Sequence, residues 1–230
     1  HWILFFTTKG RVYRAKGYEL PDAGRDARGQ HVANLLAFQP DGKIAQVLDL
    51  RDFSAADYLV LATRDGMVKK SRLREFDSIR SNGLAAINLR EGDELISAQL
   101  VSAEDDMLLV SAKGASVRFR ADDSTLRPMG RATSGVQGIR LRPGDSTLSM
   151  EVVRPGSHLV TVTDGGFAKR TSVSEWRTQG RNTFGVTAMK LVEQRGSLVG
   201  ALICEESDEL YAIASNGVVI RTRVDQVRST

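Results

Sequence analysis

Along the chain, short runs of apolar and often β-branched residues alternate with short polar segments that contain glycine. Five places share one pattern, in which an apolar run, two or three small or polar residues and a glycine precede a second short run. This pattern predicts a β-hairpin whose turn needs a residue that tolerates positive φ. The hairpin glycines, spaced by 48 to 56 residues, are Gly10, Gly66, Gly114, Gly166 and Gly217.

A second glycine follows each of the first four hairpin glycines after 17 to 21 residues, and a leucine follows it six residues later. These loop glycines are Gly29, Gly83, Gly135 and Gly185. Each loop leads into a predicted third strand, such as 31–38, and then into a fourth, such as 43–50. Four short strands per period and little helical periodicity predict an all-β, bladed architecture, whereas a β-sandwich has no reason to repeat its sequence. The repeats span 1–56, 57–104, 105–156, 157–207 and the opening hairpin 208–230.

Composition sets few limits on function. The chain has 230 residues, 41% of them hydrophobic, and its 32 Lys and Arg against 28 Asp and Glu leave a net charge of only +4, so the position of the cations must decide what they bind. The single cysteine, Cys204, lies in an apolar run and is predicted to be a buried, inert thiol in a reducing compartment. No apolar run approaches the roughly 18 residues that span a bilayer, and the N-terminal segment does not resemble a signal peptide. We expect a soluble, cytoplasmic protein without a membrane partner, and His1 within a strand suggests a piece of a longer polypeptide.

A basic residue stands four positions after every hairpin glycine, and we call these five residues the basic column: Arg14, Lys70, Arg118, Arg170 and Arg221. A solvated strand face is the alternative, but acidic or neutral residues should then have entered the column. In a disc of blades one repeat position occupies one radial place, so the basic column predicts a ring of positive charge around the rim. Lys69 and Lys169 accompany it, together with Arg11, Lys16, Arg72, Arg120 and Arg223.

A ring of cations suits the phosphate backbone of double-stranded DNA bent around it. Bending costs about 1–6 kcal/mol for 20–30 base pairs, which several distributed contacts can offset. Aromatic residues make up 6% of the chain, so no stacking surface for single-stranded bases is expected. The loops that contain the loop glycines add further cations whose neighbouring N–H groups could hold phosphate oxygens, unless each loop is only a blade-closing turn. These loop cations are Arg28, Arg80, Arg131 and Arg181.

The sequence gives little support to an enzyme. The three histidines are scattered, no Cys/His cluster has metal-ligand spacing, and neither a GxSxG nor a Walker A sequence occurs. The segment 180–185 has the two glycines of a P-loop but lacks the lysine and the hydroxyl residue that must follow them. The tyrosines lie in or beside predicted strands and are interpreted as packing residues. We therefore expect no catalytic residue, no metal and no bound cofactor.

Four long segments resemble the C-terminal domain of the DNA gyrase A subunit (and that of its topoisomerase IV relative), in the order and at the spacing of that family: 10–38, 61–83, 126–141 and 165–186. The resemblance extends over essentially the whole chain, whereas the signatures of WD40 and kelch propellers are absent. It implies a six-bladed β-pinwheel, which is propeller-like but exchanges a strand between adjacent blades. The chain would then be a single domain over 1–230, truncated at both ends, with four full repeats and the opening hairpin of a fifth.

The resemblance also implies a function. In the family this domain binds and wraps double-stranded DNA without catalysing a reaction or reading sequence, and presents a segment for ATP-driven negative supercoiling. The DNA-cleaving tyrosine, ATP and Mg²⁺ belong to other parts of the holoenzyme, a chromosome-associated heterotetramer that contains the B subunit in addition to the rest of the A subunit. Three alternatives stay open: the corresponding domain of topoisomerase IV, a propeller-like scaffold with an acidic protein partner, and a bladed enzyme.

One loop resembles a weakened copy of a family motif. The family's first blade carries the box Gln-Arg-Arg-Gly-Gly-Lys-Gly, which latches the ends of the domain and is required for wrapping. The segment QGRNTFG keeps three residues of this pattern, namely Gln179, Arg181 and Gly185. Gly180, Asn182, Thr183 and Phe184 replace an arginine, two glycines and the lysine. We expect this loop to close a blade and to touch phosphate through Arg181, without driving wrapping by itself.

Overall fold

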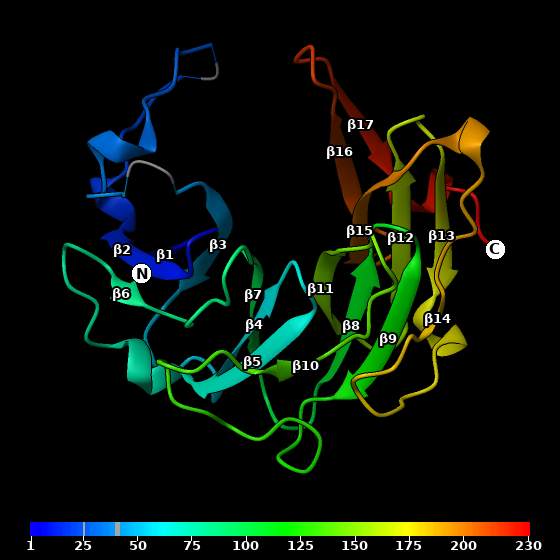
Figure 1. Ribbon diagram of the computed structural model, residues 1–230. Helices are drawn as coiled ribbons and strands as arrows, with labels where there is room; N and C mark the ends of the chain where they lie inside the picture. The colour runs from blue at the N-terminus through cyan, green and yellow to red at the C-terminus, as the bar shows by residue number, and fades with distance from the viewer. Residues whose placement is uncertain (25, 40–41) are drawn as a thin grey trace. The chain divides into compact units, whose positions relative to one another are not determined.

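The computed structural model describes residues 1–24, 26–39 and 42–230, and its regular elements are β-strands and short 3-10 helices (Figure 1). The predicted all-β class is therefore confirmed. The chain forms two compact units. The first unit comprises His1–Glu104 and Ala121–Gln137, and the second unit comprises Asp105–Arg120 and Gly138–Thr230.

All five predicted hairpins are present. Each hairpin glycine has a positive φ between 76° and 89°, and its N–H donates to the carbonyl three residues earlier, as from Gly10 to Thr7 at 3.0 Å. The turn thus needs the left-handed conformation that glycine adopts without a steric cost. The paired strands are β1 (Trp2–Thr7) with β2 (Arg11–Lys16), β4 (Tyr58–Thr63) with β5 (Met67–Arg72), β8 (Asp106–Ser111) with β9 (Ala115–Arg120), β12 (His158–Thr163) with β13 (Ala168–Ser172), and β16 (Glu209–Ile213) with β17 (Val219–Arg223).

The predicted fourth strand of each full repeat is also present. It runs antiparallel to the first strand of its own hairpin, and the register shifts at the same end of the pairing in every repeat. These strands are β3 (Ile44–Leu50), β7 (Leu95–Val101), β11 (Thr147–Val153) and β15 (Leu198–Cys204).

The third strand is shorter than predicted, but its pairing is the strand exchange between adjacent repeats that the resemblance implies. It is only two residues long and pairs with the second strand of the preceding repeat, which gives the sheet orders β3-β1-β2-β6, β7-β4-β5-β10 and β11-β8-β9-β14. The short strands are β6 (Leu84–Ala85), β10 (Val136–Gln137) and β14 (Val186–Thr187). In the first repeat the expected strand 31–38 is replaced by a 3-10 helix, η2 (Val32–Asn34), because no described strand offers this segment a pairing edge.

The loop glycines mark where an exchanged strand crosses its neighbour. A Cβ at Gly135 would lie 2.3 Å from the carbonyl oxygen of Val68, and one at Gly185 would lie 2.0 Å from that of Ser116. Both have positive φ, 83° and 67°. A side chain at either position would therefore push the exchanged strand off its partner. A Cβ at Gly29 would meet nothing within 4 Å, which agrees with the absence of a pairing in the described part of that loop.

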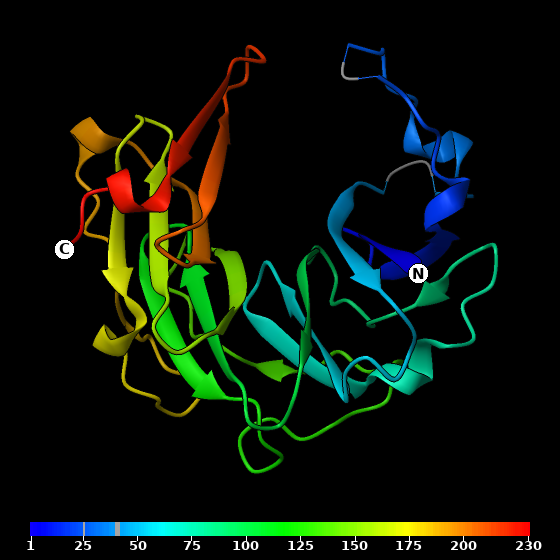
Figure 2. The same cartoon turned by 180° about the vertical axis from the view of Figure 1, so that it is seen from behind.

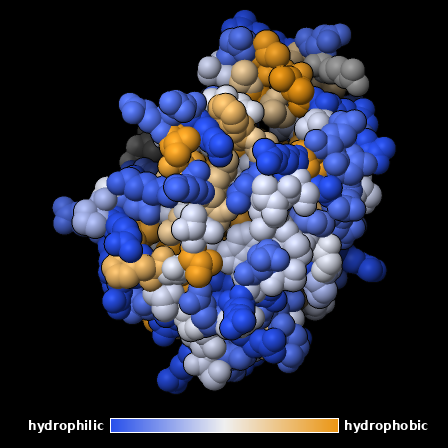
Figure 3. All heavy atoms as spheres, turned by 90° about the vertical axis from the view of Figure 1, so that its right-hand side faces the viewer, coloured by the Kyte–Doolittle hydropathy of each residue, from blue (hydrophilic) through white to orange (hydrophobic). Residues whose placement is uncertain are grey.

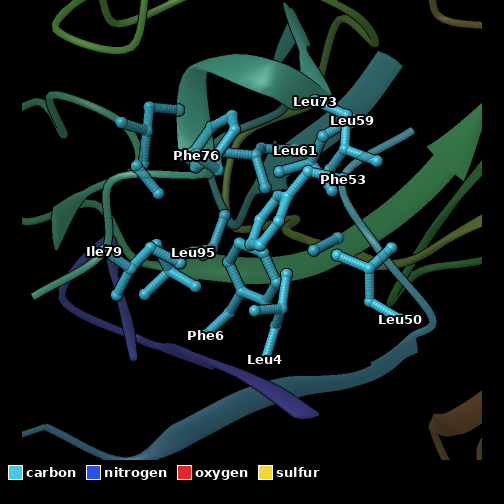
Figure 4. Packing of buried hydrophobic residues seen from close by; sticks show 14 residues of the cluster. Leu4, Phe6, Leu50, Phe53, Leu59, Leu61, Leu73, Phe76, Ile79 and Leu95 are labelled. Atoms are coloured by element: carbon cyan, nitrogen blue, oxygen red, sulfur yellow. The ribbon is translucent and has the colours of Figure 1, made fainter. Parts of the chain in front are cut away.

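Each unit has its own hydrophobic core. In the first unit the rings of Phe6, Phe53 and Phe76 point toward one another among leucines from several strands (Figure 4). In the second unit the main cluster packs around Leu159, Trp176 and Leu198. The C-terminal hairpin lies beside β12 in both Figure 1 and Figure 2, and a small cluster around Val160, Cys204 and Val224 joins them.

Candidate nucleic-acid interface

The basic column lies on the second strand of each hairpin, but most of it is covered by protein. The exposed fraction of the side chain is 0% for Lys70, 14% for Arg170, 21% for Arg118 and 26% for Arg14, and only Arg221 reaches 60%. The first four donate hydrogen bonds to main-chain carbonyls of other segments. The structure thus brings them into internal contacts, and their role in DNA binding stays a prediction.

The two lysines that precede column residues are covered as well. Lys69 is fully buried, and its Nζ donates to the carbonyl oxygens of Ala86 and Arg131, both at 2.5 Å. Burial lowers the pKa of Lys69 to about 8; the charge of Arg131 acts in the same direction and that of Glu75 opposes it. Lys169 is half-buried, and burial lowers the pKa of its amine too.

The four loop cations divide into two pairs. Arg28 and Arg80 are exposed, whereas Arg131 and Arg181 are half-buried. In the first unit Arg131 donates from Nη1 to the carbonyl of Ala85 in β6, at 3.1 Å. This loop arginine therefore braces the exchanged strand and presents only part of its guanidinium to solvent.

In the second unit the QGRNTFG loop, residues 179–185, lies against residues 138–142 of the preceding repeat. The N–H of Asn182 donates to the carbonyl of Gly138 at 2.7 Å, and the N–H of Arg140 donates to the carbonyl of Thr183 at 2.8 Å. Asn182 has a φ of 61° and is the one non-glycine residue with positive φ among those described. Asparagine tolerates this conformation, so the loop keeps a left-handed residue where the family box has glycine.

This loop pair carries an arginine–aromatic cluster that the sequence did not reveal. The guanidinium carbons of Arg140 and Arg142 lie 5.5 Å and 4.8 Å from the centre of the Phe184 ring. Both arginines are exposed, and no carboxylate among the described residues forms an ion pair with either of them. Phe184 itself is 42% exposed. The cluster therefore presents two adjacent guanidinium groups, supported by an aromatic face, to solvent.

The signal for this cluster in the sequence was weak. The positions five and seven residues after each loop glycine are basic together only in the third repeat; in the second repeat they hold Asn88 and Arg90. Only the pairing of the two loops brings Phe184 against Arg140 and Arg142. Four cations of the basic column thus have a repeated contact inside the fold, whereas Arg140 and Arg142 are grouped at the surface.

The described residues include no group of three His, Cys, Asp or Glu side chains placed to hold a metal ion. An open pocket of about 450 Å³ in the first unit is lined by residues of both charges, including Arg72, Arg127, Glu75 and Asp123. Cys204 is buried as predicted, and burial, with the charges of Asp208 and Glu151, raises the pKa of its thiol to about 11. On the face shown in Figure 3, hydrophilic residues cover most of the surface, and no described helix has the length and apolarity to cross a membrane.

The repeats match a known family. The family model described as DNA gyrase C-terminal domain, beta-propeller, matches residues 1–49, 57–102, 105–154, 157–205 and 208–230. The chain belongs to this DNA gyrase C-terminal domain family. The predicted resemblance and the bladed all-β fold of a gyrase C-terminal domain are thereby confirmed.

Relatives of this gyrase domain are gyrase A subunits. The DNA gyrase A subunit of Streptomyces coelicolor is 66% identical over 235 residues, which cover 100% of the chain and 27% of that protein. That of Mycolicibacterium smegmatis is 63% identical over 227 residues, covering 99% of the chain and 27% of that protein. The chain thus spans about a quarter of the length of these relatives.

Solved structures show the same fold. A DNA gyrase A C-terminal domain superposes with a TM-score of 0.86 at 25% identity, over 100% of this chain and 74% of the other. The C-terminal domain of a DNA topoisomerase IV superposes with a TM-score of 0.87 at 27% identity, over 100% of this chain and 71% of the other. The backbone of this chain is therefore similar to that of both the gyrase and the topoisomerase IV domain.

Proposed function

We propose that this gyrase C-terminal domain binds double-stranded DNA through its phosphate backbone and bends it, so that a gyrase holoenzyme can introduce negative supercoils. The observation that carries the proposal beyond the family assignment is the exposed cluster of Arg140, Arg142 and Phe184 on the paired loops of the second unit. Under this proposal the domain contributes no catalytic group. DNA cleavage, ATP and Mg²⁺ belong to other parts of the A subunit or to the B subunit, which together form a heterotetramer.

The chemistry of the cluster fits a phosphodiester backbone. Guanidinium groups make strong bidentate hydrogen bonds to phosphate oxygens, and an aromatic face holds them extended at a small cost in hydration. Arg140 and Arg142 have no carboxylate partner among the described residues that a phosphate would have to displace. Arg181 lies in the adjacent loop, and Arg28, Arg80 and Arg221 are exposed members of the predicted set. Each unit therefore offers cations to a phosphate backbone.

Bending requires only a few contacts. Smooth bending of 20–30 base pairs costs about 1–6 kcal/mol, and each phosphate contact releases condensed counterions. The contacts carry no base information because they address phosphates. We therefore expect binding that is independent of sequence and strongly dependent on salt.

Closing nicked circular DNA with ligase in the presence of the chain tests this function. We expect the linking-number distribution to shift, and a variant with Arg140→Gln and Arg142→Gln to shift it less. Lys190→Gln with Arg195→Gln is the matched control, since it also removes two exposed positive charges from the second unit, at positions outside the predicted set. A distribution that the chain leaves unchanged would contradict the function and favour a protein-interaction scaffold with an acidic partner.

The topoisomerase IV alternative rests on backbone similarity, since the TM-score is 0.87 to that domain and 0.86 to the gyrase domain. Identity points the other way, because both relatives at 63% and 66% are gyrase A subunits. Joining the chain to the remainder of a gyrase A subunit, with the B subunit, separates the two: supercoiling of relaxed circles supports gyrase, and decatenation without supercoiling supports topoisomerase IV.

A further inference from the structure

Four cations of the basic column make the same kind of contact from one repeat to the next. Each donates from its side chain to a main-chain carbonyl in the turn that follows the next hairpin. The bonds run from Arg14 to Asp77 at 3.0 Å, from Lys70 to Ala121 at 2.5 Å, from Arg118 to Val173 and Trp176 at 3.0 and 3.1 Å, and from Arg170 to Val227 at 2.9 Å.

The acceptors occupy equivalent places. Ala121 and Val173 stand seven residues after their hairpin glycines, and Trp176, Val227 and Asp77 stand ten or eleven residues after theirs. In most repeats this stretch is a single 3-10 turn, whose carbonyls lack the full set of partners of a longer helix. The arginines reach the far end of the turn, whereas the shorter lysine reaches only its beginning.

Three of the four cations also contact the side chain at one position of their own hairpin, eight residues before the hairpin glycine. In the first two repeats it is an aromatic ring: Arg14 lies 4.3 Å from the centre of Trp2, and Lys70 lies 4.5 Å from that of Tyr58. In the third repeat it is Asp106, 2.8 Å from Nε of Arg118. In the fourth repeat this position holds His158, and the nearby Glu206 pairs with Arg170.

The backbone of the column residues makes cross-repeat bonds as well. The carbonyl of Lys70 accepts from the N–H of Met129 at 2.7 Å, and that of Arg118 accepts from the N–H of Gln179 at 2.8 Å. Arg170 accepts from Thr230 and donates to Arg228. The side chains and the main chain of the column residues thus both bond to the next repeat. Gln179, the first residue of the QGRNTFG loop, is one of the bonded residues.

We propose that Arg14, Lys70, Arg118 and Arg170 are inter-repeat staples, which hold each repeat on the one that follows and so set the path of bound DNA, and that they are not phosphate ligands. That these residues set the path of bound DNA rests on the proposed function, whereas their role in joining the repeats does not. Only a long side chain with several N–H donors can bridge a strand to the carbonyls of the next turn. This requirement explains why the basic column contains no acidic or neutral residue.

Variants of Arg118 test the proposal on the chain, with Arg221→Gln as the matched control. Arg221 occupies the same column, but among the described residues its side chain bonds to Glu209 of its own hairpin and to no carbonyl of another repeat. We expect Arg118→Gln to lower the thermal midpoint by roughly 5–15 °C, and Arg118→Lys to restore part of the loss by bonding to one carbonyl, as Lys70 does. We expect Arg221→Gln to change the midpoint by less than about 2 °C.

DNA binding supplies the second measurement. For Arg118→Gln we expect the slope of log K against log salt to stay that of the parent chain, and the shift in linking number per bound chain to fall. A phosphate ligand would instead reduce the slope by about 0.9, and that result, or an unchanged midpoint, would overturn the proposal. If Arg118→Gln does not fold, Arg14→Gln replaces it, since Arg14 makes a single carbonyl bond. A parent chain that does not bind DNA contradicts the proposed function and the clause about its path, while the midpoints still decide whether the staples exist.

Discussion

The two units use the same repeat but fasten it with different side chains. In the first unit the partner of the staple cation within its own hairpin is an aromatic ring, as Tyr58 is for Lys70, which also pairs with the exposed Asp123 of the next repeat at 2.8 Å. In the second unit the cations pair with carboxylates, as Arg118 does with the covered Asp106 of its own hairpin. A ring keeps its attraction for a cation at any pH, whereas a carboxylate must be ionised. The repeat therefore keeps the position of the cation and leaves its partner to vary, and the partner within the hairpin should respond to acid only in the second unit.

The paired loops at the exchanged strands also differ between the two units. In the first unit the buried amine of Lys69 lies between two carbonyls of the paired loops, whereas the equivalent residue of the second unit is the buried Val117. At the surface of these loops, the first unit has Ser134 where the second has Phe184. The loop pair of the first unit is thus held by a buried cation, whereas the loop pair of the second unit carries exposed cations.

The largest loss of stability is expected at the loop glycines, which both units share. Gly185→Ala and Gly135→Ala should each destabilise their unit by at least about 3 kcal/mol, because the new Cβ would overlap a carbonyl oxygen at 2.0 and 2.3 Å. Gly156→Ala is the control: it also has positive φ, but its Cβ meets nothing within 4 Å, so it should cost only about 1–2 kcal/mol. Urea unfolding measures all three. Equal losses for Gly185→Ala and Gly156→Ala would mean that the strand exchange contributes little.

The second prediction concerns the partners of the staples. Asp106→Asn should cost about 2–3 kcal/mol at pH 7, because it leaves Arg118 without its carboxylate in a covered site. Burial acts to raise the pKa of Asp106, but the hydrogen bonds from Thr178 and Arg118 and the charges of Arg118 and Arg120 outweigh it, so the pKa lies below its ordinary value of 3.8. The stabilisation is then complete above the unfolded pKa and is lost as the pH falls through the folded one.

The free energies of unfolding of the parent chain and Asp106→Asn should therefore converge as the pH is lowered below about 4. Tyr58→Leu provides the comparison from the first unit. It removes the ring over Lys70, and its cost should stay constant over the same range. A cost of Asp106→Asn that does not change with pH would remove the distinction between the two kinds of partner.

How much of this could be foreseen differs between fold and site. The hairpins were predictable because each turn needs a glycine at positive φ, so the requirement is local and appears at Gly10 and its equivalents. The third strand was not, because its partner lies in the preceding repeat: no pattern within 31–38 indicates whether a pairing edge exists. Asn182 shows the same limit at the level of one residue, since it takes the left-handed conformation that the family's box assigns to glycine.

The site was harder to predict because a cation at a repeated position can point into the protein or into solvent. Lys70 and Arg221 share a column, yet one side chain is fully buried and the other is 60% exposed. The sequence period shows that this position is always basic. Only the contacts show that four of the five cations donate to main-chain carbonyls. Arg140 and Arg142 break the periodicity, so the cluster around Phe184 required the three-dimensional pairing of two loops.

The third prediction uses Lys69, the fully buried lysine whose place in the loop pair of the second unit is taken by Val117. The pKa of Lys69 is about 8 in the fold, below its ordinary value of 10.5, so the unfolded chain binds more protons between these values. The free energy of unfolding of the first unit should therefore rise as the pH increases from about 8 to 10.5, and Lys69→Met should abolish the rise. Lys43→Met, at an exposed position of the same unit, should leave it intact. Parallel pH profiles for the parent chain and Lys69→Met would show that burial does not penalise this charge.

The smallest effect is expected at the surface of the loop pairs, where exchanging side chains tests whether the aromatic ring organises the arginines for DNA. Phe184→Ser gives the second unit the residue of the first and should weaken DNA binding by about two- to fivefold, since an exposed cation–π contact contributes about 0.5–1 kcal/mol. The salt slope should not change, because both arginines remain. The reciprocal Ser134→Phe should not strengthen binding, since the equivalent loop of the first unit offers Asn88 in place of Arg140. If Ser134→Phe tightened binding as much as Phe184→Ser weakened it, the ring itself would contact DNA, and the arginines would not depend on it for their position.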